Sequence, residues 1–349
     1  MPTPSRSIRI VMVAGAALAM AAGASYAMAD DTAQPKAGQQ KAGQPEAGRQ
    51  KAGQPKAGQQ SSLQARSVKA FPANAKFDYQ IGSAYTPPSG VKVVSRDVGA
   101  APAAGLYNVC YINGFQTQPD DSAGSEGTSR WFAGDATRRK LLLPNPTPSV
   151  PTADDGGKYS RDFYVDPGWP DEIMFDVRTA ANRDALAQII GKQITTCAGK
   201  GFDAVEVDNL DTFTRAYADV ADRERARTDP DFDGTDAPKL MTSANALAYA
   251  KLLIDRAHAA GLAIAQKNTA ELEGDGKAAG FDFAVVEECG STGECADYAG
   301  VYGGKWVDVE YSSSGFTKAC RSVKSKISVV RRDQMVTAPG SRTYVYDEC

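Results

Sequence analysis

Acidic side chains at the ends of short apolar runs are the feature of this sequence that most directly suggests chemistry. In residues 203–208, side chains of an extended strand would alternate, so Glu206 and Asp208 share one face while Val205 and Val207 share the other. Pairs of carboxyl groups perform glycoside hydrolysis, in which one acid protonates the leaving oxygen and the other attacks the anomeric carbon or activates water. The polar side chains that end such runs are Asp97, Asp176, Asp208, Lys267, Asn268, Glu287 and Glu310.

Alternation alone leaves part of this assignment open. Glu287 and Glu288 must point to opposite faces of a continuous strand, and parity does not decide which one faces inward. The acids could also form a solvated rim, or pair with Arg178 and Lys267. Clustering of acids on several strand ends favours a functional site over that alternative.

Other catalytic chemistries have weaker support. The chain has a single histidine, His258, which lies among alanines on a predicted helix, and we expect it to be packed or hydrogen-bonded rather than a general base. No GxSxG motif or nucleotide-binding glycine motif is present. Residues 229–236 open like a calcium loop, but Leu240 occupies the position of the bidentate glutamate, so we expect an acidic surface loop. We therefore predict no metal and no cofactor.

The elements that position these acids are short strands alternating with helices, a pattern that indicates parallel pairing. Helices are predicted over residues 182–198 and 243–260, the second closed by Gly261. About eight such units favour a (β/α)8 TIM-type barrel, whose sites form at the C-terminal ends of the strands. A doubly wound open sheet is the alternative. The predicted strands are 79–81, 91–95, 107–112, 173–175, 204–207, 262–265, 283–286 and 306–309, with 328–332 as a ninth candidate and 114–170 as loops at the mouth.

The N-terminal part is expected to lie outside the barrel. Residues 1–29 have basic residues, an apolar core and a small-residue cleavage site, which predicts a signal peptide rather than a retained membrane anchor. Residues 30–70 contain KAGQ-type repeats without large apolar residues and predict a disordered linker. Residues 71–349 remain as a single catalytic domain.

Charge and cysteine content agree with an exported protein. The 349 residues carry a net charge of −3, and the basic leader and linker leave the domain more acidic, which disfavours nucleic-acid binding and favours a cationic substrate. An even number of cysteines beyond the signal suits three disulfides in an oxidising compartment, and we expect the pairs Cys289–Cys295 and Cys320–Cys349. The six cysteines are Cys110, Cys197, Cys289, Cys295, Cys320 and Cys349.

From about Phe77 to Cys349 the chain resembles the secreted endo-α-1,4-polygalactosaminidases of glycoside hydrolase family 114. The D-x-D-N-x-D, K-N-x-x-E and E-x-C blocks carry the resemblance together. The matching stretches are residues 107–113, 201–211, 257–262, 266–272, 281–289 and 309–311. The resemblance implies a TIM-type barrel that hydrolyses an α-1,4-linked galactosamine polymer, with Asp208 and Glu287 as the catalytic pair. Glu206 stands where many relatives carry aspartate.

These observations together define the expected site and its alternatives. We expect a retaining mechanism with Asp208 as nucleophile and Glu287 as acid/base, although the two roles could be exchanged. A silent carbohydrate-binding barrel and a hydrolase of another α-glycan are the alternatives. We expect a secreted, extracellular monomer that acts on a cationic amino-sugar polysaccharide, free of the membrane once the signal is removed. The silent binding barrel would keep aromatic platforms such as Trp131, Trp169 and Tyr111. The expected substrate-binding residues of the enzyme are Asp97, Tyr111, Asp176, Glu206, Asn209, Asp211, Lys267, Asn268 and Glu310.

Overall fold

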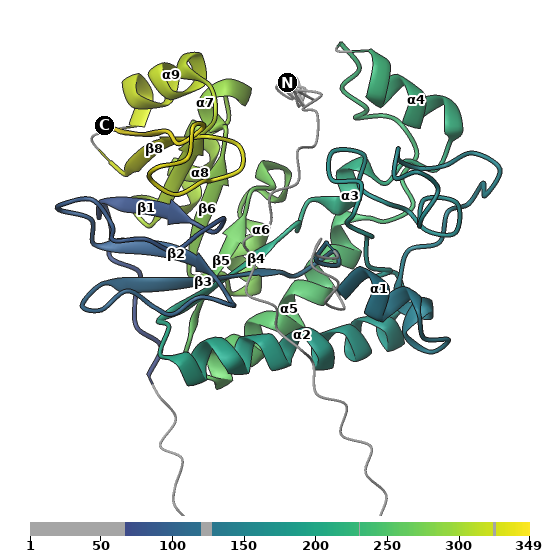
Figure 1. Ribbon diagram of the computed structural model, residues 1–349, viewed down its shortest axis with the longest axis horizontal. Coiled ribbons are helices and arrows are strands. Elements are labelled where there is room, and N and C mark those ends of the chain that lie inside the picture. The colour runs from purple at the N-terminus through teal and green to yellow at the C-terminus, as the bar shows by residue number, and fades with distance from the viewer. Residues whose placement is uncertain (1–66, 120–127, 230, 324–325) are drawn as a thin grey trace, which may run out of the picture.

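The computed structural model describes residues 67–119, 128–229, 231–323 and 326–349. The predicted signal peptide and most of the predicted linker therefore lie outside the described residues. The described strands form one curled sheet in chain order, β1 to β9, in which the first eight pair in parallel and β9 pairs antiparallel to β8 (Figure 1). The strands are β1 Phe77–Gln80, β2 Val93–Asp97, β3 Tyr107–Asn113, β4 Ala204–Asp208, β5 Ala263–Lys267, β6 Phe283–Glu287, β7 Trp306–Glu310, β8 Ser328–Arg332 and β9 Tyr346–Glu348.

Side chains join the first strand to the last parallel one and so close the TIM-type barrel. The Phe77 amide donates to Ser328 Oγ at 3.1 Å, and the Tyr346 hydroxyl donates to the Phe77 carbonyl at 3.3 Å. Arg332 and Asp78, both fully buried, form an ion pair at 3.3 Å across the same junction. The predicted barrel class is confirmed.

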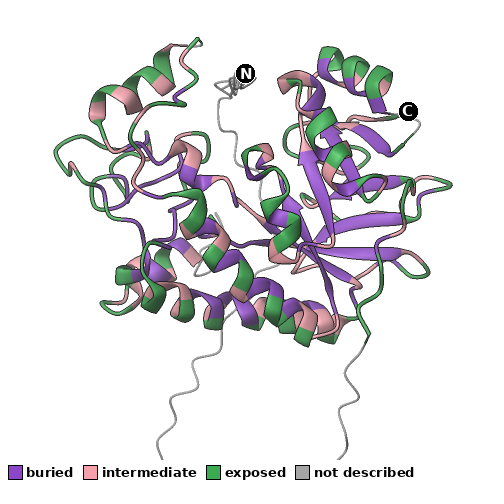
Figure 2. Ribbon diagram, turned by 180° about the vertical axis from the view of Figure 1, so that it is seen from behind, coloured by how far each residue is buried: buried purple, intermediate pink, exposed green. Residues whose placement is uncertain are grey.

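Alternation along the strands separates the barrel interior from the layer beneath the helices. Val109, Ala265 and Val285 belong to an inner apolar cluster, whereas Val205 and Ile264 belong to a larger cluster shared with the helices. Figure 2 shows the consequence, since the strands are buried along their length and the outer helices expose one face. Both faces of the sheet are therefore covered, as expected for parallel strands.

Two long helices pack side by side against the outside of the barrel, α2 Ala180–Lys200 and α5 Ser243–Ala259 (Figure 1). The Thr179 side chain caps α2, and Thr242 begins α5 with a capping box. Both predicted helices are confirmed. The other helices are α1 Thr128–Ala133, α3 Thr212–Arg215, α4 Val220–Thr228, α6 Asp275–Ala279, α7 Cys289–Thr292, α8 Cys295–Tyr302 and α9 Ser313–Val323, with short 3-10 turns η1 Arg138–Leu141 and η2 Ala270–Leu272.

The segment between β3 and α2 is an insert whose buried apolar residues belong to the large cluster shared by the outer face of the barrel and the helices. The predicted barrel strand at 173–175 is wrong, because Ile173, Met174 and Phe175 form only isolated bridges to Val165, Gln116 and Leu142. These apolar residues are buried within the insert rather than in the barrel wall. The eighth parallel strand is instead β8, which the sequence had suggested as a ninth.

Three disulfides join all six cysteines, and both predicted pairs are confirmed. Cys289 is bonded to Cys295 and Cys320 to Cys349, while Cys110 on β3 is bonded to Cys197 on α2. The last bond joins β3 to the C-terminal part of α2, which packs on the outside of the barrel. Within the described residues, no helix has the length and apolar character needed to cross a membrane.

Candidate active site

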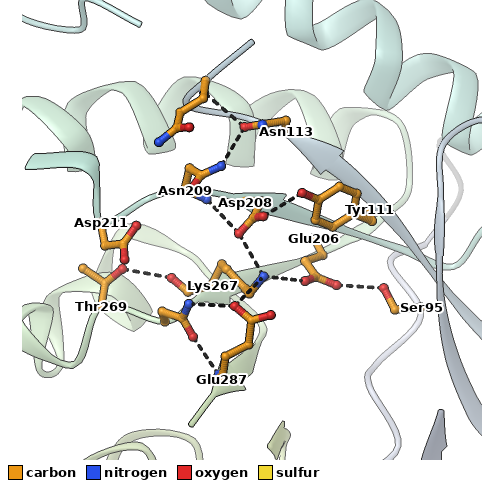
Figure 3. A network of polar contacts seen from close by, with 12 residues as sticks. Ser95, Tyr111, Asn113, Glu206, Asp208, Asn209, Asp211, Lys267, Thr269 and Glu287 are labelled. Atoms are coloured by element: carbon orange, nitrogen blue, oxygen red, sulfur yellow. Dashed lines mark hydrogen bonds and ion pairs between the residues drawn. The ribbon is translucent and has the colours of Figure 1, made fainter. Parts of the chain in front are cut away.

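One buried lysine lies at the centre of the carboxyl groups at the mouth of the barrel. Lys267 ends β5 and its side chain is 1% exposed. Its Nζ lies 2.8 Å from Asp208 Oδ1, 3.2 Å from Glu206 Oε1 and 3.3 Å from Glu287 Oε2 (Figure 3). Strands β4 and β6 flank β5, and each points its last inward residue at this nitrogen. One positive charge therefore holds three acids together.

A tyrosine hydroxyl supplements Lys267 at each catalytic candidate. Tyr111 donates to Asp208 Oδ2 at 2.6 Å, and Tyr311 donates to Glu287 Oε1 at 2.5 Å. Asp208 and Glu287 each receive the ammonium on one oxygen and a phenol on the other. The two carboxyl groups are thus fixed in orientation before any substrate binds.

Glu206 is held in a similar way but lies deeper. Tyr79 donates to its Oε1 at 2.8 Å and Ser95 to its Oε2 at 2.7 Å. The side chain is 0% exposed, whereas those of Asp208 and Glu287 are 19% and 23% exposed. Glu206 therefore supports Lys267 from below, and the two upper acids remain accessible to a ligand.

Each of the three strands turns sharply directly after its functional residue. Asn209, Asn268 and Glu288 all have left-handed backbone angles, with φ of 67°, 48° and 61°. This conformation costs a non-glycine residue about 1–2 kcal/mol. It brings the Asn209 amide to Asp208 Oδ1 at 2.9 Å.

Asn268 uses its turn to bracket Glu287. Its Oδ1 accepts from the Glu287 backbone amide at 2.7 Å, and its Nδ2 donates to Glu287 Oε2 at 3.2 Å. Glu287 consequently points inward, and it is Glu288 that leaves the barrel interior. The parity question left open by the sequence is answered in favour of Glu287.

The electrostatics of the site keep Asp208 ionised. Burial would raise the pKa of Asp208, but the Lys267 charge and the hydrogen bonds from Lys267, Tyr111 and Asn209 overcome burial and lower it below the usual value. Burial would likewise lower the pKa of Lys267, yet the surrounding carboxylates raise it well above the ordinary value. At neutral pH the pair is an ammonium and a carboxylate.

The deeper acid and the phenols behave differently. Burial, the largest influence, raises the pKa of Glu206 despite the nearby Lys267. Burial and the neighbouring carboxylates also raise the pKa values of Tyr111 and Tyr311 well above 10, so both phenols remain protonated donors. The hydrogen bonds to Asp208 and Glu287 are therefore maintained across the physiological range.

Two residues expected at the substrate make their contacts elsewhere in the structure. Glu310 is on the outer face of β7 with Trp306 and Asp308, is 0% exposed, and accepts from the Gly290 amide at 2.5 Å. The strand alternates with Val307 and Val309 facing inward, so its last residue faces the helices. Asp176 belongs to the insert, where both of its oxygens accept from the Arg178 guanidinium at 2.8 Å. Glu310 and Asp176 therefore lie outside the Lys267 cluster, and their contact with substrate stays a prediction.

Asp97 and Asp211 lie near the mouth but outside the Lys267 cluster. Asp97 accepts from the Gly99 amide at 2.7 Å, and burial raises its pKa. Asp211 pairs with Arg215 at 2.6 Å, and Arg215 also donates to Asn209 Oδ1 at 2.7 Å. Asp211 is thus linked to Asp208 only through that arginine and asparagine.

Four residues with a direct part in the network were missed by sequence reasoning. Tyr79, Ser95 and Tyr311 point to the inner face of the barrel. Strict alternation along the strands would have found Ser95 from Val93 and Tyr311 from Val309. Glu172 lies in the insert, outside any predicted strand, so no sequence pattern marked it as a site residue. Its Oε2 accepts from Asn113 Nδ2 at 2.8 Å.

Within the described residues, the one group with metal-ligand spacing is Cys289, Cys295 and Asp308. Its two cysteines are joined in a disulfide and so offer no thiolate. In the acidic loop after α4, the Lys239 ammonium bonds the carbonyls of Gly234 and Ala237 at 2.6 and 2.9 Å. That lysine supplies the positive charge there.

His258 has a structural role, as expected. Its Nε2 lies 2.9 Å from Asp282 Oδ2, and Asp282 also accepts from the Ile264 amide. The histidine therefore joins α5 to the start of β5 and β6 on the outside of the barrel. It is remote from the acids at the mouth.

A parallel barrel with two accessible, oriented carboxyl groups at the C-terminal ends of its strands is an arrangement suited to glycoside hydrolysis. The chain belongs to glycoside hydrolase family GH114, whose model matches residues 58–349. No protein of curated function matches the sequence significantly.

Solved structures share the fold at low sequence identity. The structure of Aspergillus fumigatus Ega3 in complex with galactosamine matches with a TM-score of 0.53 and 19% identity over 82% of this chain and 100% of that chain. The glycoside hydrolase domain of PelA from Pseudomonas aeruginosa matches with a TM-score of 0.45 and 14% identity over 77% of this chain and 98% of that chain. At these identities the similarity concerns the fold.

Proposed function

We propose that this glycoside hydrolase cleaves internal bonds of α-1,4-linked galactosamine polymers, with Asp208 and Glu287 as its catalytic pair. The observation that carries the proposal is that a single atom, Lys267 Nζ, contacts both carboxyl groups, at 2.8 and 3.3 Å. Membership of family GH114 and the fold shared with Ega3, which was solved with galactosamine, support the substrate class.

The same contacts support a retaining mechanism. The nearer oxygens of Asp208 and Glu287 cannot be further apart than the two Lys267 contacts laid end to end. That limit accommodates the roughly 5–5.5 Å between the carboxyl groups of retaining enzymes, whereas inverting enzymes separate theirs by roughly 6.5–9.5 Å to fit a water molecule.

The surroundings of the two acids support one assignment of their roles. Asp208 is the nucleophile, because Lys267, Tyr111 and the Asn209 amide all stabilise its charged form. Glu287 protonates the leaving glycosidic oxygen and then takes a proton from the water that releases the sugar from Asp208. During the covalent stage Asp208 is uncharged, and Lys267 retains Glu206 and Glu287 as partners.

Substrate charge follows from the composition of the site. Three acids face one lysine at the mouth, so the cluster has an excess of negative charge if its acids are ionised. A polymer of free amines offers ammonium groups to such a surface, and each charge-assisted hydrogen bond is worth about 1.5–3 kcal/mol. A fully N-acetylated polymer lacks those charges.

The decisive experiment uses one polymer in two forms. Partly deacetylated α-1,4-galactosamine polymer and its fully N-acetylated form are incubated with the wild-type protein and with Asp208→Asn, and the products are analysed by mass spectrometry. We expect a ladder of oligosaccharides from the deacetylated polymer with wild type alone. Binding without release by both proteins would instead indicate a silent carbohydrate-binding barrel, and cleavage of an unrelated α-glycan alone would indicate a different substrate.

Rescue by azide tests the two roles separately. With an activated α-glycoside, Asp208→Gly plus azide is expected to give the β-glycosyl azide, and Glu287→Ala plus azide the α-glycosyl azide. The opposite pattern would exchange the roles, and loss of rescue in both would contradict a covalent intermediate.

We also infer export of the chain in a processed form. Residues 1–29 would be removed as a signal peptide and residues 30–70 would space the barrel domain, 71–349, from the new N-terminus. The three disulfides support an oxidising destination. N-terminal sequencing of the protein from culture medium should begin at Asp30, and sedimentation should give a monomer. An intact Met1 would contradict the cleavage.

A further inference from the structure

A carboxyl group of the insert approaches Asp208, and the proposed reaction does not use it. Glu172 is 8% exposed, and its Oε2 accepts from Asn113 Nδ2 at 2.8 Å and from Asn209 Nδ2 at 3.4 Å. Asn113 is the register partner of Asp208 across β3 and β4, and Asn209 directly follows Asp208. The Glu172 carboxyl therefore lies at the level of the catalytic acid on the rim of the barrel.

Arg215, the nearby cation, pairs with groups other than Glu172. Arg215 donates through Nε to Asp166 Oδ2 at 2.7 Å, through Nη1 to Asp211 at 2.6 Å and through Nη2 to Asn209 at 2.7 Å. Within the described residues, Glu172 accepts from these two amide donors through Oε2 and forms no ion pair. A buried carboxyl group without an ion pair resists ionisation unless a positive charge arrives to pair with it.

The charge state of Glu172 follows from this environment. Burial, Asp166 and Asp208 raise the pKa of Glu172 well above its usual value, which favours the protonated form of the carboxyl group in the free enzyme. A positive charge placed beside it would favour the ionised form and release that proton. The group is therefore poised to respond to a cation rather than to a neutral ligand.

The same turn presents an aromatic ring. The Glu172 amide donates to the Trp169 carbonyl at 2.9 Å, and the Trp169 amide donates to the Asp166 carbonyl at 3.2 Å, so residues 166–172 form one compact turn. Trp169 is 43% exposed, so a ligand at the surface can reach its ring. An exposed indole is also the best aromatic partner for an ammonium group.

We propose that Glu172 is a specificity-determining residue that binds the free ammonium of a galactosamine unit next to the bond being cleaved, with Trp169 contacting the same sugar. This inference rests on the proposed function, and it identifies which group distinguishes a free amine from an N-acetyl group. On binding, the neutral Glu172 carboxyl group loses its proton to the solvent and pairs with the substrate ammonium. An acetamido group carries no charge and cannot drive that ionisation.

Kinetics of Glu172→Gln test the inference against a matched control. Asp171→Asn makes the same change from carboxyl group to amide at the adjacent, exposed position. On deacetylated oligosaccharides we expect E172Q to raise KM about 10–100-fold with a smaller effect on kcat, as for loss of a charge-assisted hydrogen bond. D171N should leave both constants unchanged. Glu172→Asp, which retains the charge, should recover most of the preference and also serves if E172Q does not fold.

Proton release provides a readout that a structural role would not change. Calorimetry in two buffers of different ionisation enthalpy at pH 6 measures protons released when deacetylated oligosaccharide binds to Glu287→Gln, which binds without turnover. We expect release by E287Q and its loss in E287Q/E172Q. Equal release by both, or an equal fall in kcat on every substrate, would overturn the inference. If wild type cleaves no galactosamine polymer, the proposed function fails; if E172Q retains the wild-type KM, only this inference fails.

Discussion

The Tyr311 hydroxyl donates a 2.5 Å hydrogen bond to Glu287 Oε1, although the residue before it, Glu310, faces the opposite side of β7. The strand end thus delivers a phenol, not a carboxyl group, to the catalytic site. Because that phenol and Lys267 hold the two oxygens of Glu287, small changes at position 311 should affect the orientation of the acid/base directly.

Tyr311→Phe is expected to lower kcat about 10–100-fold with little change in KM. It removes one hydrogen bond to the acid/base, worth about 1.5–3 kcal/mol in a charged pair. Steady-state release of reducing ends measures the effect. Tyr249→Phe is the matched control, because the Tyr249 hydroxyl is buried with no partner. That control should retain full activity and gain about 1 kcal/mol in unfolding free energy. Full activity in Y311F would contradict the assignment.

Lys267→Met is expected to abolish activity and to reverse the pH dependence of stability at this site. The raised pKa of Lys267 keeps its stabilisation present throughout pH 5–7, and that contribution is lost only as pH rises through the raised value. The lowered pKa of Asp208 makes its contribution full above about pH 4 and lost as pH falls through the lowered value.

Without the lysine, three adjacent acids lose their cation, at a cost of about 3–5 kcal/mol at pH 7. The K267M variant should therefore become more stable when pH falls from 7 to 5, because its carboxyl groups can then take up protons. Thermal unfolding of both proteins across this range measures the difference. Parallel curves for wild type and variant would show that Lys267 does not organise the cluster.

Asp308→Asn is expected to stabilise the protein at neutral and alkaline pH without affecting KM. Burial and Glu310 raise the pKa of Asp308 well above its usual value. A group of this kind contributes stability below its unfolded pKa near 4, and loses it as pH rises through the raised folded value. Asparagine keeps the acceptor for the Cys289 amide, which Asp308 Oδ1 serves at 3.3 Å, and carries no charge.

The difference in unfolding free energy between D308N and wild type should therefore grow from pH 5 to pH 8, reaching roughly 1–3 kcal/mol. Urea unfolding at several pH values measures it. A shift in KM on any substrate would instead place this pair at the substrate, against the position of β7 found here. A constant difference between pH 5 and pH 8 would show that Asp308 does not titrate there.

Removing the Cys110–Cys197 bond should cost more than removing Cys289–Cys295. The first closes a loop with a sequence separation of 87 residues and the second one of 6, so chain entropy gives about 4–5 and about 2 kcal/mol respectively. Urea unfolding of the paired Cys→Ala variants measures both. A reversed order would show that packing around Cys289, rather than loop closure, dominates.

The sequence was sufficient to predict a site residue where the pattern of a single strand determines which way its side chain points. Alternation placed Glu206 and Asp208 on one face, and the structure has both on Lys267. The role of Lys267 as a common partner needed the register of three strands, which no single run of residues encodes. The outward direction of Glu310 could not be predicted because β7 is buried on both faces, and its apolar pattern does not distinguish inside from outside.

The insert could not be predicted for a different reason. Ile173 to Phe175 are as apolar as a barrel strand, and only their partners in the insert show that they pair elsewhere. Glu172 precedes that run and reaches Asn113 across 59 residues of sequence. Contacts of such range depend on how a long irregular segment folds back, which local spacing does not report.

The left-handed residues Asn209, Asn268 and Glu288 fix the direction in which the chain leaves each functional strand. The loop after each of these residues therefore begins at a fixed position. Such a loop can change in length or sequence while Asp208, Lys267 and Glu287 keep their positions. Grafted loops and randomised libraries at the mouth should therefore begin one residue later and leave these three positions untouched. Diversity in the polymer accepted can then evolve on top of unchanged bond-breaking chemistry.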